Sequence, residues 1–417
     1  MIYDIREFGA IGDGEAINTK AIQAAIQAAA QTAGRVLVSG GVYKTGSVRL
    51  LDNVELHIAA DGVLLGSENC DDYPEWDTAH VDRDMLPRWR SACLIFAEEA
   101  QNISITGNGK IDCNGYSFVR KKEDENQLWK YERIPDLLTP PRVVFFVGCK
   151  NVHIKDVTMI NQPAGWSYWI HDCDFVHIRG LNILADVNFP NNDGIHINSS
   201  RDVIVSDCNI VTGDDSLVIR ANNASLKENK ACERVTVTNC NLISHACGIR
   251  IGWTKDGTIR NCTFSNLTMT DCTTGINIMI PYRNRDPKPE IPTRGISDVG
   301  RELTLIENLS FSNIVMDRIA WEPIHVRLDG DVPDIKAVRD LLFSGIRARG
   351  ARFPTIVAKE SCPVENVKLI GCSFTVTDSE DGKAQNGCWD AYAVYYPMTL
   401  HWVKNLRLTD TDFTVEK

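Results

Sequence analysis

The chain has 417 residues, of which 43% are hydrophobic and 24% are charged, and its formal net charge is -11 at pH 7. This composition is that of an ordinary globular protein and excludes a disordered chain. The acidic balance, without a long run of Lys or Arg, argues against nonspecific nucleic-acid binding. The opening MIYDIREFGAIGDG has no uninterrupted apolar stretch. We therefore expect neither a signal peptide nor a membrane span, and a cytoplasmic location.

The first predicted element is an α-helix at residues 17–34, INTKAIQAAIQAAAQTAG. Asn18 or Thr19 can cap its start and Gly34 its end. One face of this helix carries its apolar residues Ile22, Ala25, Ile26 and Ala29. We expect the helix to cover the open end of a stack of strands, because an uncovered end presents unpaired strand edges.

A charged segment, RKKEDENQLWKYER from Arg120 to Arg133, interrupts the strand pattern further along the chain. It predicts an excursion loop over residues 116–140. Two interpretations stay open for this loop. It either forms one wall of a groove or lies in solvent as a surface loop.

Repeated segments of alternating β-branched residues follow, each broken by an Asn/Asp/Cys turn. Aligning them on Val152, Val176, Val203 and Val235 gives steps of 24, 27 and 32 residues. Period-two alternation indicates strands rather than the helices of a TPR or ankyrin array. Stacked units of this kind predict an all-β fold, a parallel β-helix that forms a single domain over residues 1–417.

The cysteines favour a reduced, buried role. The chain has 14 of them, and five recur in one local context, as in HDCDF, SDCNI, TNCNL, RNCTF and GCSF. A small apolar side chain at one repeated position indicates a buried stack rather than a disulfide framework. No CxxC pair is present to suggest zinc.

Three carboxylates occur in the motifs NNDG, which contains Asp193, and GDDS, which contains Asp214 and Asp215. Asp193 and Asp215 are 22 residues apart, about one coil. Adjacent strands lie about 4.8 Å apart, so we expect these side chains to be stacked, with Asp214 beside them. Their mutual repulsion would raise the pKa of at least one of them, as a protonated acid beside an ionised base requires. Plain turn residues and a calcium site are the alternatives.

Alternation also predicts what surrounds the carboxylates. It places the isoleucines and leucine of DGIHI, DSLVI and CGIRI inward. Polar residues then face outward on the side of the acids: His196, Asn198, Arg220, Arg250 and Asn277. A groove lined by acids, amides, His and Arg has the side chains that sugar recognition requires. Three tryptophans, Trp166, Trp169 and Trp253, are either core and turn residues or stacking platforms for sugar rings.

The acidic motifs and the opening of the chain together resemble a known enzyme family. NNDG followed by GDD, with the opening FGAIGDG…NTKAIQAAI and GGVYKTGSVRLLDNVELHI, resembles glycoside hydrolase family 28, the polygalacturonases, from about residue 7 to 280. The resemblance implies a right-handed parallel β-helix and inverting hydrolysis without a metal or cofactor. By position, Asp214 resembles the general acid, and Asp193 and Asp215 resemble the bases that activate water. Inversion predicts an acid and a base about 6.5 to 9.5 Å apart.

The chain departs from the family pattern at two places. Cys247, in ACGIRIG, stands where the family has a His, and Asn277 and Met279 stand where it has the Arg and Lys that hold the sugar carboxylate. We expect Arg250 to substitute as the cation, with Arg220 second and the loop residues Arg283 and Arg285 as further candidates. Cys247 is interpreted as a filler rather than a nucleophile, since no base beside it is evident. Asn191, His196, Cys247, Asn277 and Trp253 complete the predicted substrate-binding set.

The sequence therefore predicts an inverting glycoside hydrolase, exo-acting on short oligosaccharides derived from pectin or a related polymer. Its partner would be the oligosaccharide, with no nucleic acid and no membrane, and the sequence does not define an oligomeric state. Three alternatives stay open: a polysaccharide lyase on the same fold, a hydrolase of a non-uronate sugar, and a noncatalytic carbohydrate-binding β-helix.

Overall fold

The structure is a computed structural model that describes residues 1–124, 127–253, 255–280, 302–328, 335–377 and 398–416. It divides into two compact units. The N-terminal unit comprises residues 1–125, 129–196 and 200–214, and the C-terminal unit comprises residues 126–128, 197–199 and 215–417. The single domain over residues 1–417 stays a prediction. In the ranges given above, no helix has the length and apolar character needed to cross a membrane.

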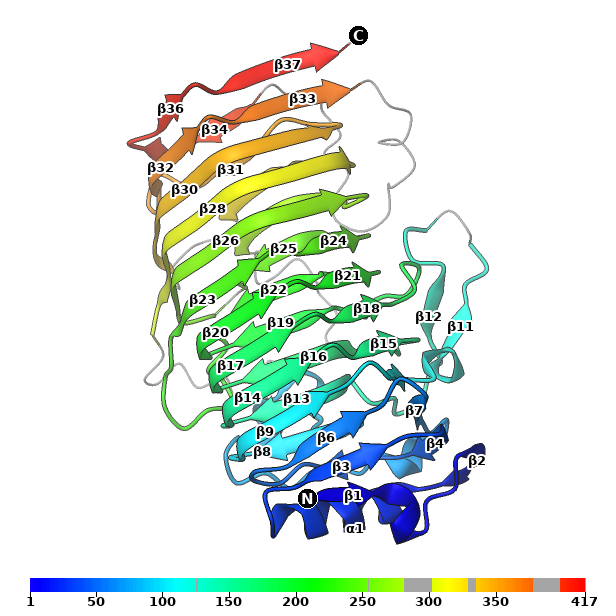
Figure 1. The fold of residues 1–417 in the computed structure, drawn as a ribbon. Coiled ribbons are helices and arrows are strands. Elements are labelled where there is room, and N and C mark those ends of the chain that lie inside the picture. Colours follow the sequence, from blue (N-terminus) through cyan, green and yellow to red (C-terminus); the bar gives the residue numbers. More distant parts are fainter. Residues whose placement is uncertain (125–126, 254, 281–301, 329–334, 378–397, 417) are drawn as a thin grey trace. The chain divides into compact units, whose positions relative to one another are not determined.

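The N-terminal unit is a coil of parallel strands on three faces (Figure 1). The first face pairs β1 to β3, β6, β9, β14, β17 and β20 in that order. Their bounds are Ile2–Asp4, Arg35–Val38, Glu55–Ile58, Gln101–Thr106, Lys150–Lys155, Asp174–Arg179 and Arg201–Ser206. The register pairs Val152 with Val176 and Val176 with Val203, which confirms the alignment made from the sequence at these positions.

The second and third faces repeat this parallel order. The second pairs β2, β4, β7, β10, β15, β18 and β21, at Asp13–Ile17, Gly41–Thr45, Gly62–Gly66, Lys110–Asp112, Thr158–Ile160, Asn182–Leu184 and Asn209–Thr212. The third pairs β5, β8, β13 and β16, at Val48–Arg49, Ile95–Glu98, Arg142–Val147 and Trp166–His171. The next strand along the chain, β19, spans Ile195–Asn198.

The C-terminal unit continues with parallel strands, several of them longer. One set contains β23 (Cys232–Thr238), β24 (Asn241–Ser244), β26 (Thr258–Thr270), β28 (Thr304–Ile319), β30 (Ile335–Gly350), β32 (Val364–Ile370), β33 (Ser373–Thr377), β35 (Val403–Lys404), β36 (Arg407–Thr409) and β37 (Asp412–Glu416). The other contains β22 (Leu217–Arg220), β25 (Cys247–Ile251), β27 (Thr274–Ile280), β29 (Ile324–Leu328), β31 (Thr355–Val357) and β34 (Thr399–His401). The predicted parallel β-helix is thus confirmed.

Helix α1 spans Thr19–Ala30, shorter at both ends than the predicted 17–34. Its buried residues are Ile22, Ala25, Ile26 and Ala29, the predicted apolar face. Asn18 precedes the helix, but its side chain makes no capping hydrogen bond. It bonds instead to the main chain of Ile11, Ala16 and Lys44, because these main-chain groups also need partners.

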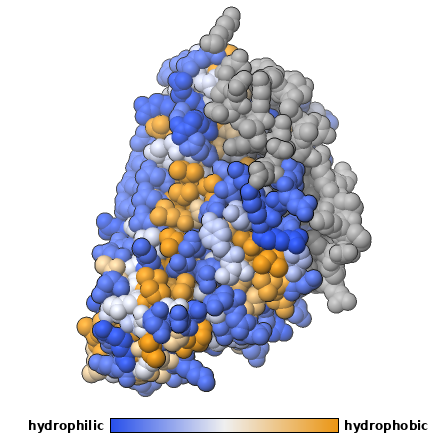
Figure 2. Space-filling view, turned by 90° about the vertical axis from the view of Figure 1, so that its right-hand side faces the viewer, coloured by the Kyte–Doolittle hydropathy of each residue, from blue (hydrophilic) through white to orange (hydrophobic). Residues whose placement is uncertain are grey.

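The core consists of inward-facing apolar ladders. Ile195, Ile197, Leu217, Ile219, Ile249 and Ile251 are all fully buried, as alternation predicts. Burying such a side chain contributes about 1.5 to 3 kcal/mol each. The recurring cysteines Cys173, Cys208, Cys240, Cys262 and Cys372 are buried as well, and each thiol donates to the carbonyl two residues before it. Outside, apolar areas lie among hydrophilic ones (Figure 2).

An asparagine ladder forms one corner of the N-terminal unit. Asn53, Asn102 and Asn151 all have positive φ, between 55° and 60°, which Asn tolerates better than most residues. Asn102 Nδ2 donates to Asn53 Oδ1 at 2.7 Å, and Asn151 Nδ2 donates to Asn102 Oδ1 at 2.7 Å. Each amide therefore fixes the turn of the neighbouring coil.

Two excursions leave the N-terminal coils. The first, between β7 and β8, contains the short 3₁₀ helices η2 (Cys70–Asp72), η3 (Arg83–Met85) and η4 (Pro87–Trp89). The second, between β10 and β13, contains η5 (Gly115–Phe118) and an antiparallel hairpin of β11 (Val119–Lys121) and β12 (Tyr131–Arg133). The hairpin lies within the predicted 116–140 loop. Its Tyr131 packs against buried Phe189, so this part of the segment is folded against the coil.

Candidate active site

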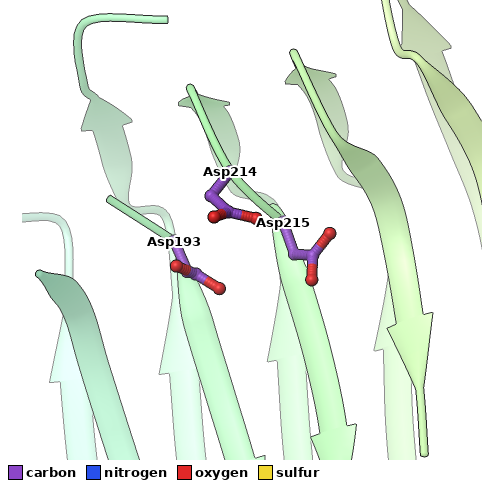
Figure 3. A group of neighbouring side chains, drawn as sticks. All are labelled: Asp193, Asp214 and Asp215. Atoms are coloured by element: carbon purple, nitrogen blue, oxygen red, sulfur yellow. The ribbon is translucent and has the colours of Figure 1, made fainter. Parts of the chain in front are cut away.

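The three acidic residues of the motifs lie together. Asp193 precedes β19, and Asp214 and Asp215 lie in the turn between β21 and β22. One carboxylate oxygen from each of the three lies within 4.8 Å of the others, and Figure 3 shows the three side chains as neighbours. These oxygens are closer than the acid–base separation of about 6.5 to 9.5 Å expected for inversion. They approach the spacing of about 5 to 5.5 Å that is typical of retaining enzymes.

Asp193 is held by a histidine three residues later. His196 Nε2 lies 2.8 Å from Asp193 Oδ2, and both residues are 4% exposed. The His196 ring stacks on the ring of Trp166, with centroids 4.0 Å apart. His196 therefore does not project freely into solvent. Trp166 presents one ring face to His196.

Asp214 is positioned by the asparagines of the NNDG motif. Its Oδ2 accepts from the backbone N–H of Asn191 at 3.1 Å and from Asn191 Nδ2 at 3.0 Å. Asn192 Oδ1 accepts from the N–H groups of Gly213 and Asp214, at 2.8 and 3.2 Å. Asn192 is fully buried and joins the two motifs. Asn192 was not among the residues predicted from the sequence, although the doubled Asn of the motif could have indicated it.

Asp215 contacts the rung that carries the departure from the family pattern. Its Oδ1 accepts from the backbone N–H of Cys247 at 3.1 Å. The thiol of Cys247 is 6% exposed, and burial, followed by the charge of Asp215, raises its pKa well above the ordinary value. Asn277 Nδ2 donates to Cys247 Sγ at 3.2 Å. A neutral, buried thiol fits the interpretation of Cys247 as a filler.

The two predicted substitute cations have different surroundings. Arg220 donates to both oxygens of Asp256, from Nε at 2.6 Å and Nη2 at 2.7 Å, and Asp256 is fully buried. Arg250 is 6% exposed and its guanidinium lies 4.4 Å from the ring centroid of Trp253. Its Nη2 has no hydrogen-bond partner in the part of the chain that the structure describes. Arg250 can therefore accept an anion, whereas Arg220 is already neutralised.

The remaining predicted residues are placed as follows. Trp253 lies beneath Arg250 as a cation–π partner, and Trp169, 2% exposed, packs on Phe145 in the core. Asn277 is 6% exposed and pairs in register with Arg250. Arg283 and Arg285 lie outside the described residues.

Two cations that sequence reasoning missed also act on the acids. Arg88 and Arg133, from the two excursions, are close enough to Asp193 and Asp214 to interact electrostatically with both. No periodic signal marked either residue. Oxygen atoms of the three carboxylates have the chemistry to bind a cation, but positive charges of this kind beside them oppose one.

The comparisons with known proteins agree with this fold. The family model described as "Glycosyl hydrolases family 28" matches residues 82–234. A probable polygalacturonase of Vitis vinifera is 26% identical over 302 residues, 70% of this chain and 59% of that protein. An exo-poly-alpha-D-galacturonosidase of Dickeya chrysanthemi is 30% identical over 254 residues, 52% of this chain and 41% of that protein. The matches thus span about half the length of these two relatives.

Among solved structures, that of a hyperthermoactive exopolygalacturonase from Thermotoga maritima superposes with a TM-score of 0.68 at 21% identity, over 90% of this chain and 87% of that chain. This likeness establishes the fold as a right-handed parallel β-helix. The chain is therefore a parallel β-helix that carries a cluster of three carboxylates. The chain is thus similar to glycoside hydrolase family 28 over residues 82–234 and to polygalacturonases among its relatives, as the resemblance predicted.

Proposed function

We propose that this protein hydrolyses galacturonate-containing oligosaccharides from one end, with inversion at the anomeric carbon. The observation that carries the hydrolysis is the convergence of Asp193, Asp214 and Asp215 within 4.8 Å, and the inverting outcome follows from the family resemblance. Two carboxyl groups of different protonation are the minimum that glycoside hydrolysis needs. The exo mode is supported by relatives whose names describe exo-acting enzymes.

Asp214 is the proposed general acid, which protonates the leaving glycosidic oxygen. Because its Oδ2 already accepts two N–H groups of Asn191, the transferable proton belongs on Oδ1. The turn that carries Asp214 is anchored through Gly213 and its own N–H to Asn192. This anchoring limits the motion of the acid, and fixed geometry contributes much of the rate in such reactions.

Asp193 and Asp215 are the proposed bases that orient and deprotonate the attacking water. His196 bonds to Asp193 Oδ2 and thereby fixes the direction of its other oxygen. The N–H of Cys247 does the same for Asp215 Oδ1. Both carboxylates are thus held by groups that do not themselves take part in the proposed chemistry.

Arg250 is the proposed ligand of the sugar carboxylate. It replaces the Arg and Lys of the family pattern, which are absent here at Asn277 and Met279. Its Nη2 is buried without a hydrogen-bond partner in the described ranges, which costs about 1 to 3 kcal/mol unless a ligand satisfies it. A uronate carboxylate supplies the missing acceptor, whereas a neutral sugar would offer a weaker one.

The short carboxylate spacing favours a second candidate, hydrolysis with retention. Proton NMR of the first-formed product separates the two, with defined oligogalacturonides and matched neutral oligosaccharides as substrates. We expect a monosaccharide product of the opposite anomer, from the uronate substrates only. The substrate anomer in the early product would establish retention. An ultraviolet-absorbing unsaturated product would indicate a lyase, and tight binding without turnover would indicate a binding protein.

A further inference from the structure

Two arginines from separate excursions of the N-terminal unit meet at one carbonyl. Arg88 Nη1 donates to Ala164 O at 3.2 Å, and Arg133 Nε donates to the same oxygen at 2.9 Å. Arg133 Nη2 also donates to Asn191 Oδ1 at 3.0 Å. Since Asn191 bonds to Asp214, the arginine pair is linked directly to the residue that positions the proposed acid.

The backbone at Arg88 is fixed in an uncommon conformation. Arg88 has φ of +63° inside the short helix η4, a region that non-glycine residues rarely adopt. Such conformations persist where the surroundings determine them, often at ligand-binding sites. Here Arg142, 1% exposed, donates to the carbonyls of Pro87 and Arg90 on either side. Arg142 itself packs over the ring of Trp169, so the turn that presents Arg88 is anchored in the core.

The charges of this pair are poorly balanced. Neither Arg88 nor Arg133 forms an ion pair with any residue that the structure describes, and their hydrogen bonds go to the carbonyl of Ala164 and the side-chain oxygen of Asn191. Burial lowers the pKa of Arg88. Burial, and then repulsion by Arg88, lowers the pKa of Arg133 to about 9. The charges of Asp193 and Asp214 act in the opposite direction and raise the pKa of both arginines. A bound anion would complete the neutralisation.

We propose that Arg88 and Arg133 bind the carboxylate of a uronate residue adjacent to the bond that is cleaved. The inference rests on the proposed function and adds a second carboxylate ligand set to Arg250. Guanidinium groups suit this role because they present several N–H donors in a plane that matches a carboxylate. Both arginines have such donors beyond those already bonded to Ala164 and Asn191. The pair therefore makes specificity for acidic sugars a property of the excursions as well as of the coil.

The test compares galacturonate with its methyl ester, which removes the negative charge while keeping the ring. Calorimetry measures binding of each to the full chain and to three variants: Arg88→Gln, Arg88→Lys and, as matched control, Arg179→Gln. Arg179 is a surface arginine of β17, paired with Asp207. We expect Arg88→Gln to weaken galacturonate binding roughly 10- to 100-fold, the worth of a charge-assisted hydrogen bond. Methyl ester binding should not change, and Arg179→Gln should match the wild type.

Arg88→Lys keeps the charge and loses the planar donors, so an intermediate loss is expected. It also serves if Arg88→Gln fails to fold, as judged by circular dichroism. Arg133→Gln should weaken galacturonate binding as well, and should in addition lower kcat because Asn191 loses its donor. The inference would be overturned if the wild type bound galacturonate and its methyl ester equally well. It would also be overturned if Arg88→Gln bound galacturonate as tightly as the wild type.

Failure of the inference and failure of the proposed function give different results. Hydrolysis of oligogalacturonides with an unchanged KM in Arg88→Gln removes the role of the arginine pair and leaves the hydrolase intact. Arg88-dependent binding of galacturonate without any turnover keeps the arginine pair and removes the hydrolase. A raised KM with an unchanged kcat in Arg88→Gln supports both the role of the arginine pair and the hydrolase.

Discussion

Two rungs of the molecule have the same backbone pattern and opposite chemistry. The rung 193–197 begins with Asp193 and has His196 three residues later, and the rung 247–251 begins with Cys247 and has Arg250 three residues later. In both, the two isoleucines are fully buried. Asp193 and His196 bond to one another, whereas Cys247 is a neutral thiol and Arg250 packs on Trp253. The coil determines where a side chain lies, and residue identity alone determines whether the position can transfer protons or hold an anion.

The largest effect is expected from removing the proton of the proposed acid. Asp214→Asn should lower kcat by about 10³- to 10⁴-fold, because general acid catalysis is lost while the Asn191 hydrogen bonds can persist. Initial rates on oligogalacturonides measure this, with circular dichroism as a check of folding. Asp207→Asn, which alters an exposed aspartate paired with Arg179, is the matched control. Near-native turnover in Asp214→Asn would remove the acid assignment.

The next prediction concerns the free energy of unfolding and the ion pair between Arg220 and Asp256, which lies near the rung 247–251. Asp256→Asn should lower the free energy of unfolding by about 3 kcal/mol, because Arg220 would lose its buried partner. Urea denaturation followed by fluorescence measures the change. The double variant Arg220→Met, Asp256→Leu should recover most of the loss, since no uncompensated charge remains. A single variant as stable as the wild type would show that this pair does not support the rung.

A smaller effect on rate is expected at His196. His196→Gln keeps a donor near Asp193 and loses the ring that stacks on Trp166. We expect kcat to fall about 10-fold, less than the roughly 10²- to 10⁴-fold effect of a proton-transfer group, because the residue orients the base and does not react. The pH–rate profile should keep its shape. A lost limb in that profile would instead assign His196 a direct proton transfer.

The smallest effect is expected at the thiol. Cys247→Ser should change kcat less than about threefold and cost about 1 kcal/mol of stability, as for a modest change at a buried site. Because the pKa of Cys247 is raised well above its ordinary value, the thiol stays protonated as the pH rises towards 9. The pH–rate profiles of Cys247→Ser and the wild type should therefore superimpose up to about pH 9. A loss of 100-fold or more would contradict the filler role.

Sequence reasoning predicted the parts of the molecule that are periodic. The apolar face of α1, the register of Val152 with Val176 and Val203, and the inward isoleucines follow from alternation and helical spacing. The carboxylates were also predictable, because a separation of 22 residues is about one coil and one coil is one strand spacing.

The missed residues lie where the chain is not periodic. Arg88 and Arg133 are on excursions whose position depends on tertiary contacts such as those of Arg142 with Pro87 and Arg90. The partner of Arg220 is Asp256, 36 residues later in a turn, and no spacing rule connects them. The sequence therefore could not show that Arg220, predicted as the second substitute cation, is already neutralised by Asp256.

The corner ladder of Asn53, Asn102 and Asn151 has a consequence for how such chains change in length. The middle amide, Asn102, donates to Asn53 of the coil before and accepts from Asn151 of the coil after. A whole coil that carries its own asparagine can therefore be inserted or deleted without breaking the chain of amides. A carboxylate at position 102 could accept from Asn151 but could not donate to Asn53 Oδ1. Growth of the protein by complete turns is thus compatible with this corner, whereas a single Asn-to-Asp replacement interrupts it.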